Sequence, residues 1–118
     1  MVKRADTKKQ SECLSDMLPV RDALGVINGK WKMMILISIM HDNKRFREIE
    51  RSIPKITSKV LAKELKDLEE NKLIKRTVYD DVPVLVEYTP TDYVKSLEKV
   101  MKELHIWGVN HRKKMFGK

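Results

Sequence analysis

Residues 56–71, ITSKVLAKELKDLEEN, have the pattern of one amphipathic helix with two chemically different faces. Each residue advances about 100° around a helix axis, so residues three and four apart share a face. One face consists of the leucines Leu61, Leu65 and Leu68. The roughly opposite face consists of the lysines Lys59, Lys63 and Lys66. We expect the leucines to enter a core and the lysines to face an anionic partner, with the Thr57 hydroxyl capping the first turn.

The hydrophobic period changes directly after this helix. Residues 73–79 (LIKRTVY) and 84–89 (VLVEYT) are rich in β-branched and aromatic residues and partly alternate, which is typical of strands. The short segment 80–83 (DDVP) lies between them. The pattern therefore predicts a β-hairpin that follows the long helix.

A short helix is predicted before the long one. Residues 47–52 carry the apolar Ile49, and Pro54 ends this helix because the residue before a proline is driven out of α geometry. Residues 44–46 could form a single β-bridge ahead of it. The short helix, the four-residue break 53–56 and the long helix together form a helix-turn-helix pattern.

The segments that come earlier in the chain surround this unit. Residues 30–40 are apolar on almost every side, which predicts a central helix. An earlier helix is expected to begin at Pro19, which suits a first turn, and to end at Asn28. Residues 1–16 are polar and charged, so we expect a flexible basic arm there, followed by one domain over residues 17–118.

The last helix has more apolar surface than one small domain can cover. It is predicted to start after Thr91 as its cap and to run to about His111. The apolar surplus indicates a partner subunit. The residues expected in that dimer interface are Leu97, Met101, Leu104, His105 and Trp107. The predicted fold class is therefore mainly α with a small β-hairpin (α+β).

The composition limits the partners and the compartment. The formal charge of +8 and the pI near 9.6 attract polyanions such as nucleic acid, an anionic membrane surface or acidic proteins, although the chain could be merely basic. The only cysteine, Cys13, excludes an intrachain disulfide and fits a reducing cytoplasm. The longest apolar run, residues 33–37, is too short to span a membrane, and the charged N-terminus has no signal-peptide core behind it.

The pattern predicts no enzyme, no cofactor and no metal site. The chain has no phosphate-cradling glycine loop, no HExxH motif and no cysteine near a base. Its histidines, His41, His105 and His111, lack ligand spacing, so packing or interface roles are expected for them. A small-molecule effector could lie beside Trp31 or Trp107, and whether one exists stays open.

Several short motifs in a fixed order carry a family resemblance. They are NGKW at residues 28–31, RFREI at 45–49, IPKIT at 53–57, the leucines at 61, 65, 68 and 73, Arg76 with VP at 82–83 and VEY at 86–88, and WG at 107–108. In this order they resemble the HxlR-type winged-helix transcriptional regulators, relatives of the MarR group. The resemblance implies a winged helix-turn-helix fold that is dimeric through its N- and C-terminal helices and binds operator DNA near promoters.

One departure from the family pattern concerns redox sensing. Many family members carry a cysteine just before the proline that opens the first helix, and some sense electrophiles or oxidants with it. That position is Leu18 in this chain, and Cys13 lies five residues earlier. Whether Cys13 has any redox-sensing role therefore stays open.

The helix-turn-helix context favours DNA contact by the lysine face over a solvated stripe that is paired with neighbouring carboxylates. Recognition helices enter the major groove with their N-terminal end first. The residues predicted to contact DNA from this helix are Thr57, Ser58, Lys59, Ala62, Lys63 and Lys66. Phosphate contacts are predicted for Arg45, Arg47 and Lys55, with ordinary surface charge as the alternative, and contact with the DNA backbone or the minor groove is predicted for Arg76.

The leading hypothesis is a sequence-specific, cytoplasmic transcriptional regulator that binds double-stranded operator DNA as a homodimer at a near-palindrome. The alternatives are a winged-helix protein-interaction module and a non-specific nucleic-acid binder. The acidic hairpin tip at Asp80 and Asp81 keeps these alternatives open, because it repels phosphate. We expect the tip to stay off the DNA or to form salt bridges inward.

Overall fold

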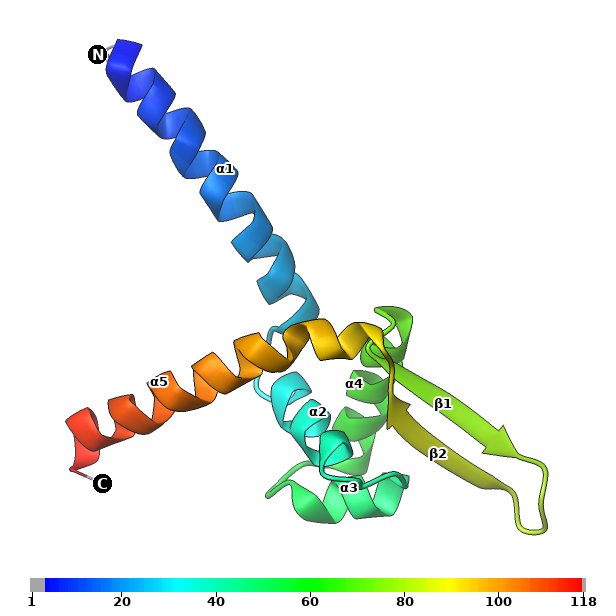
Figure 1. Ribbon diagram of the computed structural model, residues 1–118. Coiled ribbons are helices and arrows are strands. Elements are labelled where there is room, and N and C mark those ends of the chain that lie inside the picture. Colours follow the sequence, from blue (N-terminus) through cyan, green and yellow to red (C-terminus); the bar gives the residue numbers. More distant parts are fainter. Residues whose placement is uncertain (1–3, 118) are drawn as a thin grey trace.

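The computed structural model describes residues 4–117. Five α-helices, one 3-10 helix and a two-stranded antiparallel sheet make up this part of the chain (Figure 1). In chain order they are α1 (Arg4–Ile27), α2 (Lys32–Met40), α3 (Phe46–Ser52), α4 (Ser58–Glu70), β1 (Ile74–Tyr79), β2 (Leu85–Pro90), η1 (Tyr93–Leu97) and α5 (Glu98–Phe116). The predicted α+β class and the order of its elements are confirmed.

The core lies between α2, α3, α4 and the base of the hairpin. Ile35 and Leu36 of α2 are completely buried, and so is Ile49 of α3. The leucines of the α4 face are buried as well, Leu61, Leu65 and Leu68. Burying a leucine side chain contributes about 1.5–3 kcal/mol, so this face holds α4 firmly against α2. The predicted leucine face and the predicted central helix are both confirmed.

Side-chain caps set the ends of the two helices in the helix-turn-helix. The Glu48 carboxylate accepts hydrogen bonds from the backbone N–H groups of Arg45 and Lys44, at 2.9 and 3.1 Å. These two bonds favour the charged form and hold the pKa of Glu48 below its usual range. In the second helix, Thr57 Oγ1 accepts a hydrogen bond from the Val60 N–H at 3.2 Å. The predicted Thr57 cap is therefore confirmed.

Three predicted helix starts are wrong by one or two residues. Helix α2 begins at Lys32 rather than residue 30, because Gly29 has a φ of 87° and Trp31 serves as the N-cap. Helix α3 begins at Phe46 rather than residue 47. Helix α4 begins at Ser58 rather than residue 56, because its N-cap Thr57 is extended, with a ψ of 157°.

The antiparallel hairpin β1–β2, called the wing below, extends from the end of α4. Arg76 of β1 lies directly opposite Tyr88 of β2. The Tyr88 N–H donates to the Lys44 carbonyl at 2.7 Å, which joins the wing to the segment before α3. This single hydrogen bond takes the place of the bridge that was considered for residues 44–46. The predicted hairpin is confirmed.

Helix α1 covers most of residues 1–16, where a flexible basic arm is expected. Residues 4–16 are helical and continue through Pro19 to Ile27, while residues 1–3 lie outside the described residues. The stretch 4–24 contains no glycine, so helix propensity is not broken before Gly25. The single proline removes one backbone donor without ending the helix. Figure 1 shows α1 extending away from the rest of the chain.

The C-terminal helical segment begins as predicted and ends later. Thr91 Oγ1 accepts a hydrogen bond from the Val94 N–H at 3.3 Å and donates to the Lys72 carbonyl at 2.7 Å. The first turn is the 3-10 helix η1 rather than α-helix. Helix α5 then runs five residues beyond the predicted end near His111, to Phe116, where Gly117 ends it with a φ of 72°.

The molecule is elongated because α1 and α5 lie outside its body, which consists of α2, α3, α4 and the wing. The radius of gyration is 18.7 Å, compared with about 13 Å for a compact domain of 100 residues. Within the described residues no single helix is long and apolar enough to cross a membrane. The bent pair α1–α2 reaches that length and composition only together, and residues of α2 form the core.

Candidate nucleic-acid interface

The lysine face of α4 is open to solvent. Lys59, Lys63 and Lys66 are exposed, and Ala62 lies exposed among them. Because the leucines on the other side are buried, α4 presents these four residues outward at a fixed rotation. No carboxylate of the described residues lies within 4.0 Å of the Lys59 or Lys66 ammonium groups. An ammonium stripe on the second helix of a helix-turn-helix matches the chemistry of DNA phosphates and guanine edges.

The N-terminal end of α4 brings Thr57 and Ser58 to the surface. Thr57 Oγ1 is occupied as the acceptor of the helix cap. Ser58 Oγ donates to Glu50 Oε2 of α3 at 2.5 Å, so this hydroxyl links the two helices of the motif. Lys55 is exposed in the turn before them, where its φ of 66° is left-handed. The partial positive charge of the helix N-terminus favours an anion at this end.

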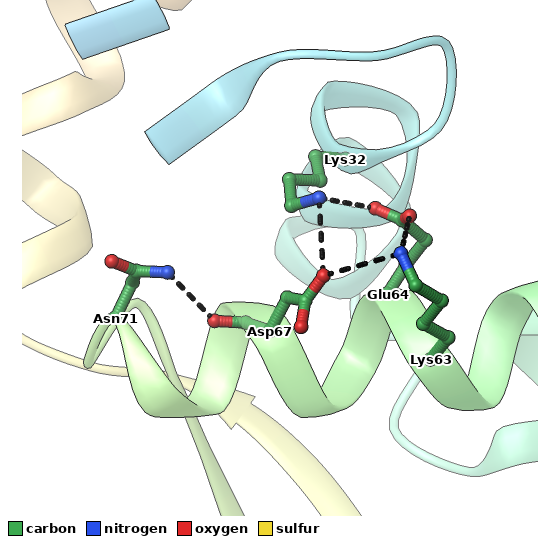
Figure 2. A network of polar contacts seen from close by, with 5 residues as sticks. All are labelled: Lys32, Lys63, Glu64, Asp67 and Asn71. Atoms are coloured by element: carbon green, nitrogen blue, oxygen red, sulfur yellow. Dashed lines mark hydrogen bonds and ion pairs between the residues drawn. The ribbon is translucent and has the colours of Figure 1, made fainter. Parts of the chain in front are cut away.

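A polar network joins the lysine face to α2 (Figure 2). Lys32 Nζ lies 2.6 Å from Glu64 Oε2 and 3.5 Å from Asp67 Oδ2. Lys63 Nζ lies 3.9 Å from Glu64 Oε1 and 3.8 Å from Asp67 Oδ2. The ion pairs expected in the alternative interpretation therefore exist for Lys63. The Asn71 side chain donates to the Asp67 carbonyl at 2.9 Å and closes the end of the helix.

Lys32 is the buried member of this network and is only 7% exposed. Burial lowers its pKa, but the hydrogen bonds and the charges of Glu64 and Asp67 outweigh that effect and raise the pKa above its usual 10.5. The ammonium group is therefore charged at neutral pH. Lys32 could not be identified from the sequence, because it lies in an apolar run and its partners are 32 and 35 residues away.

Arg45 and Arg47 line a common cleft of about 390 Å³ between α3 and β2. Arg51 lines the same cleft and was not identified from the sequence. Its spacing of four residues from Arg47 places both on one side of a helix, which is the signal that could have revealed it. On the other side, Val84, Leu85 and Val86 form the wall.

Arg76 and the wing tip do not belong to that cleft. Arg76 is exposed on β1, and the residues lining the cleft do not include it. Asp80 and Asp81 are exposed at the tip of the wing, and neither forms an ion pair with a described residue. The expected inward salt bridge of the tip is therefore not present in the described chain.

The predicted dimer residues fall into two groups. Leu97 and Met101 are partly buried and pack against the core of their own chain. Leu104, His105 and Trp107 are exposed, and no residue of α5 is buried. Leu104 and Trp107 line an apolar cleft of about 680 Å³ along α5. The indole of Trp107 also stacks on His111, with ring centroids 4.9 Å apart.

Helix α1 carries a second exposed apolar surface. Met17, Val20 and Leu24 line a shallow cleft of about 440 Å³, which also includes the exposed Cys13. Among the described residues no group of three or more His, Cys, Asp or Glu side chains could hold a metal ion.

Comparisons with known proteins agree with this geometry. The family model described as HxlR-like helix-turn-helix matches residues 26–116. The HTH-type transcriptional regulator YtcD of Bacillus subtilis is 42% identical over 100 residues, which cover 85% of this chain and 79% of that protein. The crystal structure of YtcD has a TM-score of 0.73 at 44% identity, over 78% of this chain and 94% of that chain.

A second solved structure has the same winged-helix architecture. The redox regulator HypR in its reduced form has a TM-score of 0.77 at 36% identity, over 85% of this chain and 99% of that chain. The wing, the helix-turn-helix and the order of the motifs match the resemblance read from the sequence. The chain therefore belongs to the HxlR-like helix-turn-helix family of transcriptional regulators.

Proposed function

We propose that the protein is a sequence-specific regulator that binds operator DNA as a homodimer, with α4 in the major groove. The observation that carries this proposal is the exposed lysine face of α4, which its buried leucines hold outward. A rigid helix that presents cations on one side is suited to follow a groove lined by phosphates. Family membership supports DNA as the partner.

We assign the contacts according to position. Contacts to base edges or to phosphates are assigned to the first turns of α4 and its N-cap, through Thr57, Ser58, Lys59, Ala62, Lys63 and Lys66. Phosphates fall to the cleft between α3 and β2, through Arg45, Arg47 and now also Arg51. Lys55 and Arg76 are exposed and serve as further phosphate contacts in this proposal. Ser58 has to exchange its bond with Glu50 for one with DNA.

The homodimer is proposed to form through α1 and α5. Both helices carry exposed apolar surfaces, which soluble chains normally cover with a partner. In a two-fold dimer the two α4 helices would read half-sites about one DNA turn, roughly 34 Å, apart. The operator is then a near-palindrome. We further propose a cytoplasmic, non-enzymatic protein, because a regulator acts where its DNA is.

Fluorescence anisotropy tests sequence specificity directly. The protein is titrated into a labelled duplex from upstream of its own gene and into a scrambled duplex of the same composition, at matched salt. We expect tighter binding to the upstream duplex by at least about tenfold, since specific binding exceeds non-specific binding by far more than this in known regulators. Equal affinity would support a non-specific binder, and no binding to either duplex would support a protein-interaction module.

Lys63→Ala tests the lysine face. If Lys63 contacts a phosphate, the variant should weaken operator binding and lower the slope of log affinity against log salt by about one. Lys102→Ala is the matched control, because it removes the same charge from an exposed position on α5. An unchanged slope in Lys63→Ala would remove this residue from the interface.

A further inference from the structure

Helix α4 is not cationic as a whole. It carries three lysines and four carboxylates, Glu64, Asp67, Glu69 and Glu70. Glu69 and Glu70 lie in the last turn, away from the leading end of the helix. Glu64 and Asp67 instead border the lysine face, beside Lys63. Two uncompensated carboxylates at that place would repel the phosphates that the lysines attract.

Lys32, which lies on α2, compensates the negative charge of these two carboxylates. Its ammonium reaches α4 from α2 and contacts both groups, at 2.6 Å for Glu64 and 3.5 Å for Asp67 (Figure 2). The side chain of Glu64 is 13% exposed and that of Asp67 is 35% exposed, so water screens these contacts only partly. Lys32 itself lies in the protein interior and is not available to DNA.

Lys63 competes for the same two carboxylates. Its ammonium lies 3.9 Å from Glu64 and 3.8 Å from Asp67, and these distances are longer than those of Lys32. The Lys63 side chain is 74% exposed, and exposed ion pairs at such distances contribute little. While Lys32 holds the carboxylates, Lys63 is free to leave them. Without Lys32, Lys63 would be their only cation among the described ion pairs.

We infer that Lys32 is a positioning residue for DNA binding. It holds Glu64 and Asp67 against α2, lowers their repulsion of phosphate and leaves Lys63 available to the DNA backbone. A buried residue on a different helix thereby sets the effective charge of the recognition face. This inference rests on the proposed function, since it concerns how the same face binds operator DNA.

The decisive variant is Lys32→Met, which keeps an unbranched apolar side chain at the buried site and removes the charge. Operator binding is measured by anisotropy across a salt series, at a temperature where circular dichroism shows the variant to be folded. We expect the salt slope to fall by about one and the affinity to weaken about threefold to tenfold near 100 mM salt, as for the loss of one phosphate contact. Lys32→Arg, which keeps the charge, should retain the wild-type slope.

Two further combinations separate positioning from mere stability. Adding Glu64→Gln and Asp67→Asn to Lys32→Met should restore the slope, because no carboxylate then holds Lys63. Adding Lys63→Ala to Lys32→Met should lower the slope no further, since both changes remove the same contact. A purely structural role of Lys32 would produce neither the rescue nor this lack of additivity.

Some outcomes would overturn the inference alone. One such outcome is a wild-type protein that prefers its operator and a folded Lys32→Met variant whose salt slope is unchanged. Another is a lower salt slope in Lys32→Met that Glu64→Gln and Asp67→Asn do not restore. If Lys32→Met does not fold, Glu64→Gln with Asp67→Asn in the wild-type background serves instead. It should leave the slope unchanged, and a rise of about one would mean that Lys63 was held all along. Wild-type protein without operator preference would instead overturn the proposed function.

Discussion

Helices α4 and α5 have similar apolar spacing and very different surroundings. The leucines Leu61, Leu65 and Leu68 of α4 are buried in one core cluster with residues of α2 and α3. In α5 no residue is buried, and Trp107 is 66% exposed. An apolar stripe therefore predicts only that one face of a helix packs against another apolar surface. Whether that surface belongs to the same chain depends on the neighbouring elements. The core formed by α2, α3, α4 and the base of the wing is covered within one chain, whereas α1 and α5 carry exposed apolar surface.

The largest expected effect is that of Leu65→Ala in the body. The truncation leaves a cavity at a fully buried site and should reduce the free energy of unfolding by about 2–5 kcal/mol, measured by urea titration. Leu24→Ala is the matched control, because Leu24 of α1 is 55% exposed. At protein concentrations where the monomer dominates, the control should change stability by less than about 0.5 kcal/mol. A comparable loss in both variants would contradict the contrast between body and outer helices.

Trp107→Ala tests the outer helices themselves. Large exposed aromatic residues contribute most to protein interfaces, so we expect self-association to weaken by about 2 kcal/mol, or roughly 30-fold in the dimer Kd. Sedimentation equilibrium gives this constant directly. Lys102→Ala on the same helix should leave it nearly unchanged. A wild-type protein that stays monomeric at micromolar concentration would refute the proposed dimer.

Thr57→Ala tests the N-cap of α4, where the core-packed helix meets the surface proposed to bind DNA. The variant loses the acceptor for the Val60 N–H, which should lower the unfolding free energy by about 1 kcal/mol. Thr57→Ser keeps the hydroxyl and should keep most of that stability. If the two variants are equally stable in denaturant titrations, the cap contributes nothing to α4.

The smallest effect is expected from Glu48, which caps the exposed start of α3. Its pKa is lower in the folded protein than the usual 4.5, because backbone hydrogen bonds from Arg45 and Lys44 favour the carboxylate. The stabilisation is therefore complete above pH 4.5 and is lost as the pH falls through the lower, folded-state pKa. Unfolding titrations at several pH values should show this loss in the wild type and a weaker one in Glu48→Gln. Parallel pH profiles would remove Glu48 as a cap.

The local elements could be predicted because short-range rules determine them. The leucine face of α4, the Thr57 cap and the wing follow from residue spacing, hydroxyl chemistry and β-branched composition. Helix ends were less predictable, since the φ of Gly29 and the extended Thr57 decide them. The assigned DNA contacts stay predictions that the binding experiments test.

The remaining features could not be predicted because they depend on distant or weak signals. Residues 4–16 carry polar side chains without a clear period, and a helix there leaves no amphipathic pattern to read. Lys32 meets Glu64 only through the packing of α2 on α4. Arg51 joins Arg45 because the wing closes their cleft from the other side. Pairings of this kind follow from tertiary structure.

The hydrogen bond from Tyr88 to Lys44 has a mechanical consequence for the wing. Together with the Thr91 hydrogen bond to the Lys72 carbonyl, just after α4, it holds the hairpin near its base, and no ion pair among the described residues holds the acidic tip. Because the described contacts hold the hairpin at its base, the segment around Asp80 and Asp81 is the part of the wing whose displacement would disturb α4 and the core least.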